Sequence, residues 1–203
     1  LIKNARGITV IILDTREDLS GTGATPPEAS EAAVPGGPAD EAGVPPAERL
    51  VLSQVLSPRR VVIWDVEVEK DTVLRILAAT VGRDVGIDNA EGLFESIKTR
   101  EAQGSTFFNE GVAFPHVRVE GLNAPVIALG LTKKGVSDVV GEKPIAIVFL
   151  ILSPAQAPET QVKLLGLASR AAQNRHLMQA LRSVRTPDEA VRAIREWEAP
   201  IAR

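Results

Sequence analysis

One histidine stands out among the side chains that could do chemistry, because the backbone next to it is constrained. The chain has two histidines, and His116 lies in the stretch GVAFPHVRV directly after Pro115. The proline restricts Phe114 to extended conformations and so fixes the approach to the histidine. A histidine at the end of such a segment tends to point into a cleft. There, a neutral imidazole nitrogen is a nucleophile at neutral pH, because its usual pKa is about 6.5.

A cation and two hydroxyls come shortly before this histidine in the sequence. The stretch TREAQGST holds Arg100, Ser105 and Thr106. Arginine presents a planar fork of donors that fits a phosphate, and hydroxyls add further donors. Together with His116 these residues are suited to transfer of a phosphoryl group to nitrogen. Each also has an ordinary interpretation, since hydroxyls often cap loops and a single histidine is often structural or superficial. We adopt the ordinary interpretation for His176, in the first turn of an expected helix.

Composition excludes several other kinds of site. The chain has no cysteine, which excludes disulfides and thiolate metal sites, and two histidines alone make a zinc site unexpected. We therefore expect neither a thiolate metal site nor a zinc site. The net charge is −3, and the basic residues are scattered, so we expect no binding to nucleic acid. No apolar run approaches the roughly 20 residues of a membrane span, and the absence of cysteine fits a reducing, cytoplasmic compartment.

The chain divides into three expected parts. Residues 1–19 contain the apolar stretch GITVIILDT, which predicts a strand at 7–15. Residues 20–48 are rich in proline, glycine, alanine and acidic side chains, which is typical of a linker without regular secondary structure. Residues 49–203 have the pattern of one α/β domain. Because the sequence begins with Leu1, we expect it to be a fragment of a longer protein.

Within 49–203, strands and helices alternate at first, and helices dominate later. Apolar and β-branched runs predict strands at 60–66, 125–135 and 144–153, the last at the centre of a sheet. The stretch RLVLSQVL, at 49–56, predicts a short helix or strand. Helical periodicity and capping residues predict helices at 69–82, 88–104, 157–173, 174–184 and 186–199, with Gly82 as the end of the first. This order favours a sheet with helices on both faces.

The segment REAQGSTFFNEGVAFPH resembles the active-site segment of EIIA domains of the bacterial phosphoenolpyruvate-dependent sugar phosphotransferase system, in the mannitol/fructose/nitrogen-regulatory class. That family has an Arg-Glu pair, a Ser-Thr pair and a glycine-led apolar stretch before a Pro-His pair. The matching residues here are Arg100-Glu101, Ser105-Thr106, Gly111 to Phe114, and Pro115-His116. The resemblance extends from about residue 60 to about residue 198 and does not cover residues 1–58.

The resemblance implies a three-layer α/β/α sandwich around a small mixed sheet. It also implies that His116 accepts a phosphoryl group from an HPr-like phosphocarrier protein, and that Arg100 holds that phosphate. Ser105 and Thr106 would form a polar wall beside it. No metal or organic cofactor is implied. The implied partners are the HPr-like protein and a transporter or EIIB-type acceptor.

One position departs from the family pattern. Many members carry a second histidine at the start of the first long C-terminal helix, where this chain has Gln161. Glutamine can donate a hydrogen bond to phosphate, but it carries neither a proton to exchange nor a positive charge. The sequence leaves two hypotheses open. The domain is either a regulatory phosphohistidine module, which includes the cytosolic tail of a membrane transporter, or a plain sugar phosphocarrier; a purely structural domain is a third alternative.

Overall fold

The fold is built on one mixed sheet, described here from a computed structural model that covers residues 50–107, 111–139 and 143–199. The expected strand at 7–15 and the expected linker at 20–48 lie outside these residues. The long strands are β1 (Leu56–Trp64), β5 (Val126–Ser137) and β6 (Ile145–Pro154), and the short ones are β2 (Val68–Glu69), β3 (Val112–Ala113) and β4 (His116–Val119). The helices are α1 (Leu52–Val55), α2 (Lys70–Val85), α3 (Ala90–Gln103), α4 (Pro158–Gln173), α5 (Arg175–Ser183) and α6 (Pro187–Glu198).

Strands β5 and β6 form the antiparallel centre of the sheet. β1 and β2 pair with β5 in parallel, and β3 and β4 pair with β6 in parallel. β6 is buried along almost its whole length, as its continuous apolar run predicted. β3 and β4 therefore lie at one side of the sheet, and the register places His116 beside Ile151 of β6.

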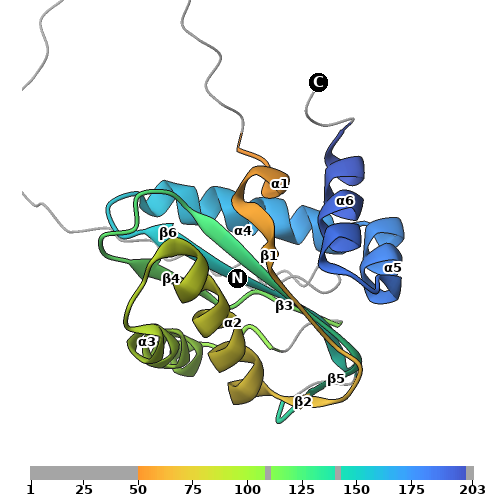
Figure 1. Ribbon diagram of the computed structural model, residues 1–203, viewed down its shortest axis with the longest axis horizontal. Coiled ribbons are helices and arrows are strands. Elements are labelled where there is room, and N and C mark those ends of the chain that lie inside the picture. Colours follow the sequence, from red (N-terminus) through yellow and green to blue (C-terminus); the bar gives the residue numbers. More distant parts are fainter. Residues whose placement is uncertain (1–49, 108–110, 140–142, 200–203) are drawn as a thin grey trace, which may run out of the picture. The chain divides into compact units, whose positions relative to one another are not determined.

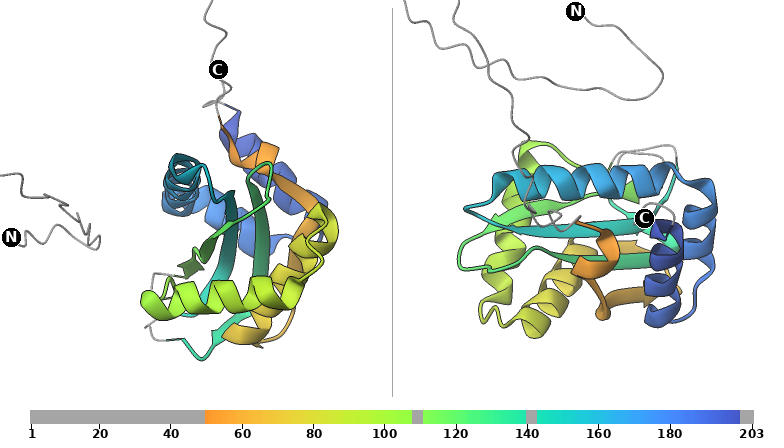
Figure 2. Two further views of the ribbon diagram at one scale, coloured as in Figure 1. Left: turned by 90° about the vertical axis from the view of Figure 1, so that its left-hand side faces the viewer. Right: turned by 90° about the horizontal axis from the view of Figure 1, so that it is seen from above.

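Helices cover both faces of this sheet, which confirms the predicted α/β/α sandwich (Figures 1 and 2). Because side chains alternate along a strand, β6 contributes to two separate cores. Ile147, Phe149 and Ile151 pack with α1, α4, α5 and α6. Val148, Leu150 and Leu152 pack with α2 and α3. We refer to the two faces as the α4 face and the α2–α3 face.

Most helix boundaries follow the predicted capping residues. The Asn89 side chain accepts a hydrogen bond from the Gly92 N–H at the start of α3, and Gly104 follows its last turn. α6, predicted at 186–199, starts with a capping box between Thr186 and Glu189.

The predicted end of α2 at Gly82 was wrong, because the helix continues to Val85 and ends at Gly86, whose φ of 75° suits glycine. Gly82 is instead buried inside the helix, where a Cβ would lie 3.1 Å from the Ile87 carbonyl oxygen. Glycine there allows the close approach of the Ile87 backbone and does not end the helix.

The ends of the described domain are tied together by a buried carboxylate. The backbone N–H groups of Leu52 and Ser53 donate to the Glu198 side chain, with 3.0 Å from the Ser53 nitrogen. The short α1, which the sequence left open between helix and strand, therefore has its first N–H groups satisfied by α6.

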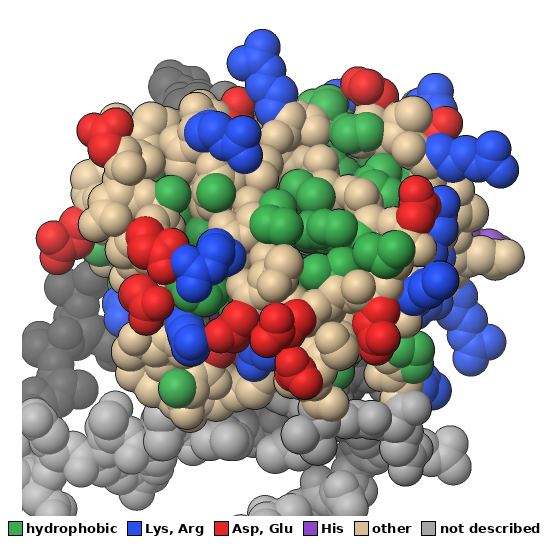
Figure 3. All heavy atoms as spheres, turned by 60° about the horizontal axis from the view of Figure 1, so that its bottom comes forward, with side chains coloured by type: hydrophobic (Ala, Val, Ile, Leu, Met, Phe, Trp, Pro, Cys, Tyr) green, Lys and Arg blue, Asp and Glu red, His purple; other side chains and the backbone are tan. Residues whose placement is uncertain are grey.

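No helix in the described part of the chain is long and apolar enough to cross a bilayer. On the face that Figure 3 shows, acidic and basic side chains are interspersed around apolar areas.

Candidate phosphoryl-transfer site

His116 is the first residue of β4, and its imidazole is held from two directions. His116 as a whole is only 8% exposed to solvent. The ring Nδ1 lies 2.9 Å from the carbonyl oxygen of Phe114. A carbonyl oxygen only accepts, so Nδ1 carries the proton and donates it. The ring is thereby locked in the tautomer that leaves a lone pair on Nε2.

Arg100, in the last turn of α3, contacts the other ring nitrogen. Its Nη2 lies 2.8 Å from His116 Nε2, and its Nη1 donates to the Gly104 carbonyl oxygen at 3.1 Å. A guanidinium is always protonated and can only donate, so Nε2 is the acceptor and the imidazole is neutral. Arg100 and His116, which the sequence analysis assigned to one candidate site, are therefore in direct contact.

The protonation equilibrium of His116 favours the same neutral form. Burial lowers the pKa of His116 below its usual value of 6.5, and the nearby charge of Arg100 lowers it further. The Phe114 carbonyl and the Glu101 carboxylate act in the opposite direction but do not outweigh these effects. The Nε2 lone pair is therefore available at neutral pH.

The carboxylate of Glu101 organises the loop between α3 and β3. Glu101 is buried at 5% exposure, although it stands next to Arg100 in the sequence. Its oxygens accept hydrogen bonds from the Thr106 N–H at 3.0 Å, the Thr106 hydroxyl at 2.6 Å and the Ser105 hydroxyl at 3.1 Å. Lys70, at the start of α2, completes the cluster, with its Nζ 3.1 Å from Glu101 and 3.0 Å from the Ser105 oxygen.

This cluster changes the expectation for the two hydroxyls. A hydroxyl has one proton to donate, and Ser105 and Thr106 both donate theirs to Glu101. In this arrangement neither can also donate to a phosphate beside His116. In the structure, Ser105 and Thr106 instead hold the loop that follows Arg100, together with Glu101 and Lys70.

Strand alternation places His116 on the same sheet face as Gln161. Val117 and Val119 pack against the α2–α3 core, so the alternate residues His116 and Arg118 point to the α4 face. On that face, buried Ser153 of β6 donates to the Gln161 side-chain oxygen at 3.1 Å. Ser153 lies two residues along β6 from Ile151, the register partner of His116. The Gln161 oxygen is occupied, which leaves its amide N–H groups as the end that could donate to a phosphate.

The sequence matches the family model of the phosphoenolpyruvate-dependent sugar phosphotransferase system, EIIA 2, over residues 54–197. The chain belongs to this family. A nitrogen regulatory protein of Pseudomonas aeruginosa is 31% identical over 138 residues, which are 68% of this chain and 90% of that protein. The fructose-specific EIIA component of Haloferax volcanii is 26% identical over 106 residues, 52% of this chain and 67% of that protein.

Solved structures agree on the fold of this EIIA domain. The crystal structure of the nitrogen regulatory protein IIA-Ntr from Neisseria meningitidis superimposes with a TM-score of 0.60 at 22% identity. That match covers 70% of this chain and 97% of the other. Both the predicted family and the predicted three-layer architecture are therefore confirmed.

Two residues at the site of this EIIA domain had no role in the sequence-based hypothesis. Glu101 stands inside the motif, and its place between Arg100 and the hydroxyls was a signal that could have been followed. Lys70 lies 30 positions before Arg100 and belongs to another helix, so only the tertiary structure brings it to the site. His176 is exposed in the first turn of α5, as predicted. No group of three His, Asp or Glu side chains in residues 50–107, 111–139 and 143–199 is arranged to hold a metal.

Proposed function

We propose that this EIIA domain accepts a phosphoryl group on Nε2 of His116 from an HPr-like phosphocarrier protein. The observation that carries the proposal is the pair of contacts on the imidazole. Phe114 fixes the proton on Nδ1, and Arg100 lies at Nε2. A nucleophilic nitrogen and a cation for phosphate oxygens are thus within reach of the same incoming group.

The transfer step follows from this arrangement. The Nε2 lone pair attacks the phosphorus of the phosphorylated imidazole on the carrier, and an N–P bond forms. The bond between phosphorus and the carrier nitrogen breaks, and its electron pair stays on that nitrogen. The Nδ1 proton remains on the bond to Phe114 throughout. Arg100 moves from Nε2 to a phosphoryl oxygen, where its charge stabilises the anionic group in transit.

We infer that the phosphorylated domain serves a regulatory role in the cytoplasm and passes its phosphate slowly. Gln161 supports this part of the proposal, because a neutral amide stands where many family members have a histidine. An amide offers donors to the bound phosphate but no positive charge to the leaving group. The partner that reads the phosphorylated state is a transporter or an EIIB-type acceptor. No metal or organic cofactor takes part in the step.

The proposed acceptor is tested by phosphorylating the full chain with labelled phosphoenolpyruvate, enzyme I and HPr. Acid-labile label is expected on His116 and is lost in His116→Ala. The matched control is His176→Ala, which removes the other histidine and should be labelled like the native chain. Label on His176, or none on the native chain, would contradict the proposal. Nuclear magnetic resonance of the phosphorylated chain distinguishes Nε2 from Nδ1 attachment.

We also propose that residues 49–203 form the phosphotransfer domain by themselves, outside the segments 1–19 and 20–48. The family match begins at residue 54, which supports this division. A chain beginning at residue 49 should accept phosphate at the rate of the full chain. A rate reduced tenfold or more would show that the N-terminal segments belong to the functional unit.

A further inference from the structure

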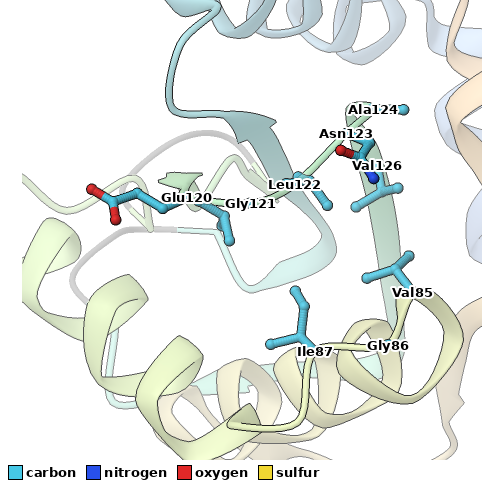
Figure 4. A pocket seen from close by; sticks show the side chains of 10 residues that line it. Val85, Gly86, Ile87, Glu120, Gly121, Leu122, Asn123, Ala124 and Val126 are labelled. Atoms are coloured by element: carbon cyan, nitrogen blue, oxygen red, sulfur yellow. The ribbon is translucent and has the colours of Figure 1, made fainter.

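Two pockets in the described part of the molecule differ in chemistry. One lies where the end of α2 meets the loop between β4 and β5, and it is lined mainly by apolar side chains such as Ile87, Leu122 and Val126. Its one charged residue, Glu120, turns its carboxylate away from the others (Figure 4). Nothing in that pocket indicates what would fill it.

The second pocket is cationic and lies beside α5. It has a volume of about 450 Å³, within the range of small-molecule sites. Its lining includes Arg175, Met178, Gln179 and Arg182 from one helix. These residues have the spacing of a single helical face. Val112 of β3, Ala172 of α4 and Lys143 complete the wall, and no carboxylate from the described residues lines it.

The two arginines are not neutralised by the described part of the chain. Among residues 50–107, 111–139 and 143–199, neither Arg175 nor Arg182 forms an ion pair or a side-chain hydrogen bond. The argument rests on these two guanidinium groups and not on Lys143. Two arginine side chains that line one hollow without a counter-charge from the described residues favour an anionic ligand.

Gly111 makes room for one of these guanidinium groups. Its φ of 92° suits glycine, and a Cβ at this position would lie 2.8 Å from Arg182 Nη2. Arg182 therefore packs directly over the backbone at the start of β3. The Gly111 carbonyl is also fixed, since it accepts hydrogen bonds from the Ala146 and Ile147 N–H groups at 2.9 and 3.2 Å. The backbone under Arg182 is thus held in place by two hydrogen bonds from β6.

The spacing of the arginines indicates the kind of anion. Arg175 and Arg182 are separated by seven positions, or about 10.5 Å along the helix axis. Met178 and Gln179 lie between them on the same face. Because the two side chains leave the helix about two turns apart, a small molecule with a phosphoryl group at each end can engage one guanidinium with each group. The middle of such a molecule would lie against the Met178 and Gln179 side chains.

We propose that this pocket is a second ligand site, separate from His116, that binds a small metabolite carrying two phosphoryl groups. Val112 in its wall belongs to β3, which leads on to His116 four residues later. Binding at this pocket needs no phosphoryl transfer to His116. The proposal can therefore be tested independently of the function proposed above.

The test is calorimetric titration of the full chain with fructose 1,6-bisphosphate, with inorganic phosphate as the single-anion probe. The bisphosphate is expected to bind at least about tenfold more tightly than phosphate, because it engages both arginines. Arg175→Ala and Arg182→Ala should each weaken its binding about tenfold. Arg195→Ala removes an exposed arginine of α6 outside the pocket and should leave binding unchanged.

Three results would overturn the proposal. The bisphosphate could fail to bind at millimolar concentration. Arg195→Ala could weaken binding as much as the pocket variants, which would show diffuse attraction of polyanions. An acidic peptide such as oligoglutamate could bind in place of the bisphosphate, which would make the surface a protein-docking site. His116→Ala should keep bisphosphate binding, and Arg182→Ala should still accept phosphate on His116. Thermal unfolding of each variant confirms that it is folded.

Discussion

The two helices next to β4 present different chemistry to the strand that begins with His116. On the α3 side, Arg100 contacts the imidazole, and Glu101 joins Lys70 and the two hydroxyls in a charged cluster. On the α4 side, the polar contact is between two neutral groups, the Ser153 hydroxyl and the Gln161 amide. The α3 side places a positive charge in contact with the imidazole, whereas the Ser153–Gln161 pair on the α4 side can offer a phosphate only neutral donors.

This asymmetry suggests how acceptance and release of phosphate are set separately. Accepting a phosphoryl group needs a neutral nitrogen and a cation near its oxygens, both of which the α3 side provides. Releasing it quickly benefits from a second group that can share charge with the phosphoryl group as it leaves. The α4 side of this domain lacks such a charge at Gln161. Substitutions on either side should therefore affect different steps.

The largest effect is expected from removing the charge on the α3 side. Arg100→Gln keeps hydrogen-bond donors but loses the positive charge, so phosphorylation of His116 should slow by about 100- to 1000-fold. Single-turnover transfer from phosphorylated HPr measures the rate. Arg118→Gln is the matched control, because Arg118 is an exposed arginine two residues from His116. Equal losses in the two variants would show that general surface charge, and not the contact of Arg100, speeds the step.

A charge added on the α4 side should act on release. Gln161→His should raise the rate of onward transfer to an EIIB-type acceptor by about 10- to 100-fold and leave His116 as the acceptor. The measurement is single-turnover transfer from the phosphorylated domain, native against variant. A native chain that already transfers as fast as the variant would remove the regulatory meaning of Gln161 and favour the plain phosphocarrier.

The Glu101 cluster should contribute to stability as well as to the site. Glu101→Gln places an amide N–H₂ among donors and removes the counter-charge of Lys70, so we expect a loss of about 2 kcal/mol in the free energy of unfolding. Urea denaturation measures the loss. Glu91→Gln on the same helix is the control, because Glu91 pairs with Arg75 at the surface and should cost less than about 0.5 kcal/mol. If Glu101→Gln and Glu91→Gln lowered the free energy of unfolding equally, the Glu101 cluster would contribute no more than an exposed ion pair.

The smallest expected effect is a shift in titration. The pKa of His116 should lie below 6.5, because burial and Arg100 both disfavour the charged ring. Arg100→Gln should raise this pKa. As the pH falls, His116 takes up a proton in the unfolded state at a higher pH than in the folded state. Its contribution to the free energy of unfolding is therefore complete above about pH 6.5 and is lost as the pH falls through the lower pKa of the folded state. Nuclear magnetic resonance titration of the imidazole, with His176→Gln to assign the signals, measures the pKa. A value at or above 6.5 in the native chain would contradict the assigned environment.

The sequence by itself determined the elements and the principal histidine. Periodicity and capping residues predicted the long helices and strands, because these signals are local and act through the backbone of a few neighbouring residues. The spacing from Arg100 to His116 identified the family for the same reason, since the motif is continuous in the chain. Two predicted boundaries were wrong: β1 runs from Leu56 to Trp64 rather than over 60–66, and α2 continues past Gly82. A glycine that stops a helix and a glycine that permits close packing look alike until the contact with Ile87 is known.

The tertiary structure alone decided which partners each side chain has. Lys70 reaches Glu101 and Ser105 from another helix. The Glu101 carboxylate accepts the hydroxyl protons of Ser105 and Thr106, which the sequence had suggested for a phosphate. The Phe114 carbonyl selected the tautomer of His116. The pocket beside α5 needs β3, α4 and α5 together. The Lys70 contact and the α5 pocket join residues distant in sequence, whereas the Glu101 and Phe114 contacts join residues two to five positions apart. In both cases a hydroxyl, imidazole or guanidinium can satisfy its hydrogen bonds in many ways until the fold limits it to one.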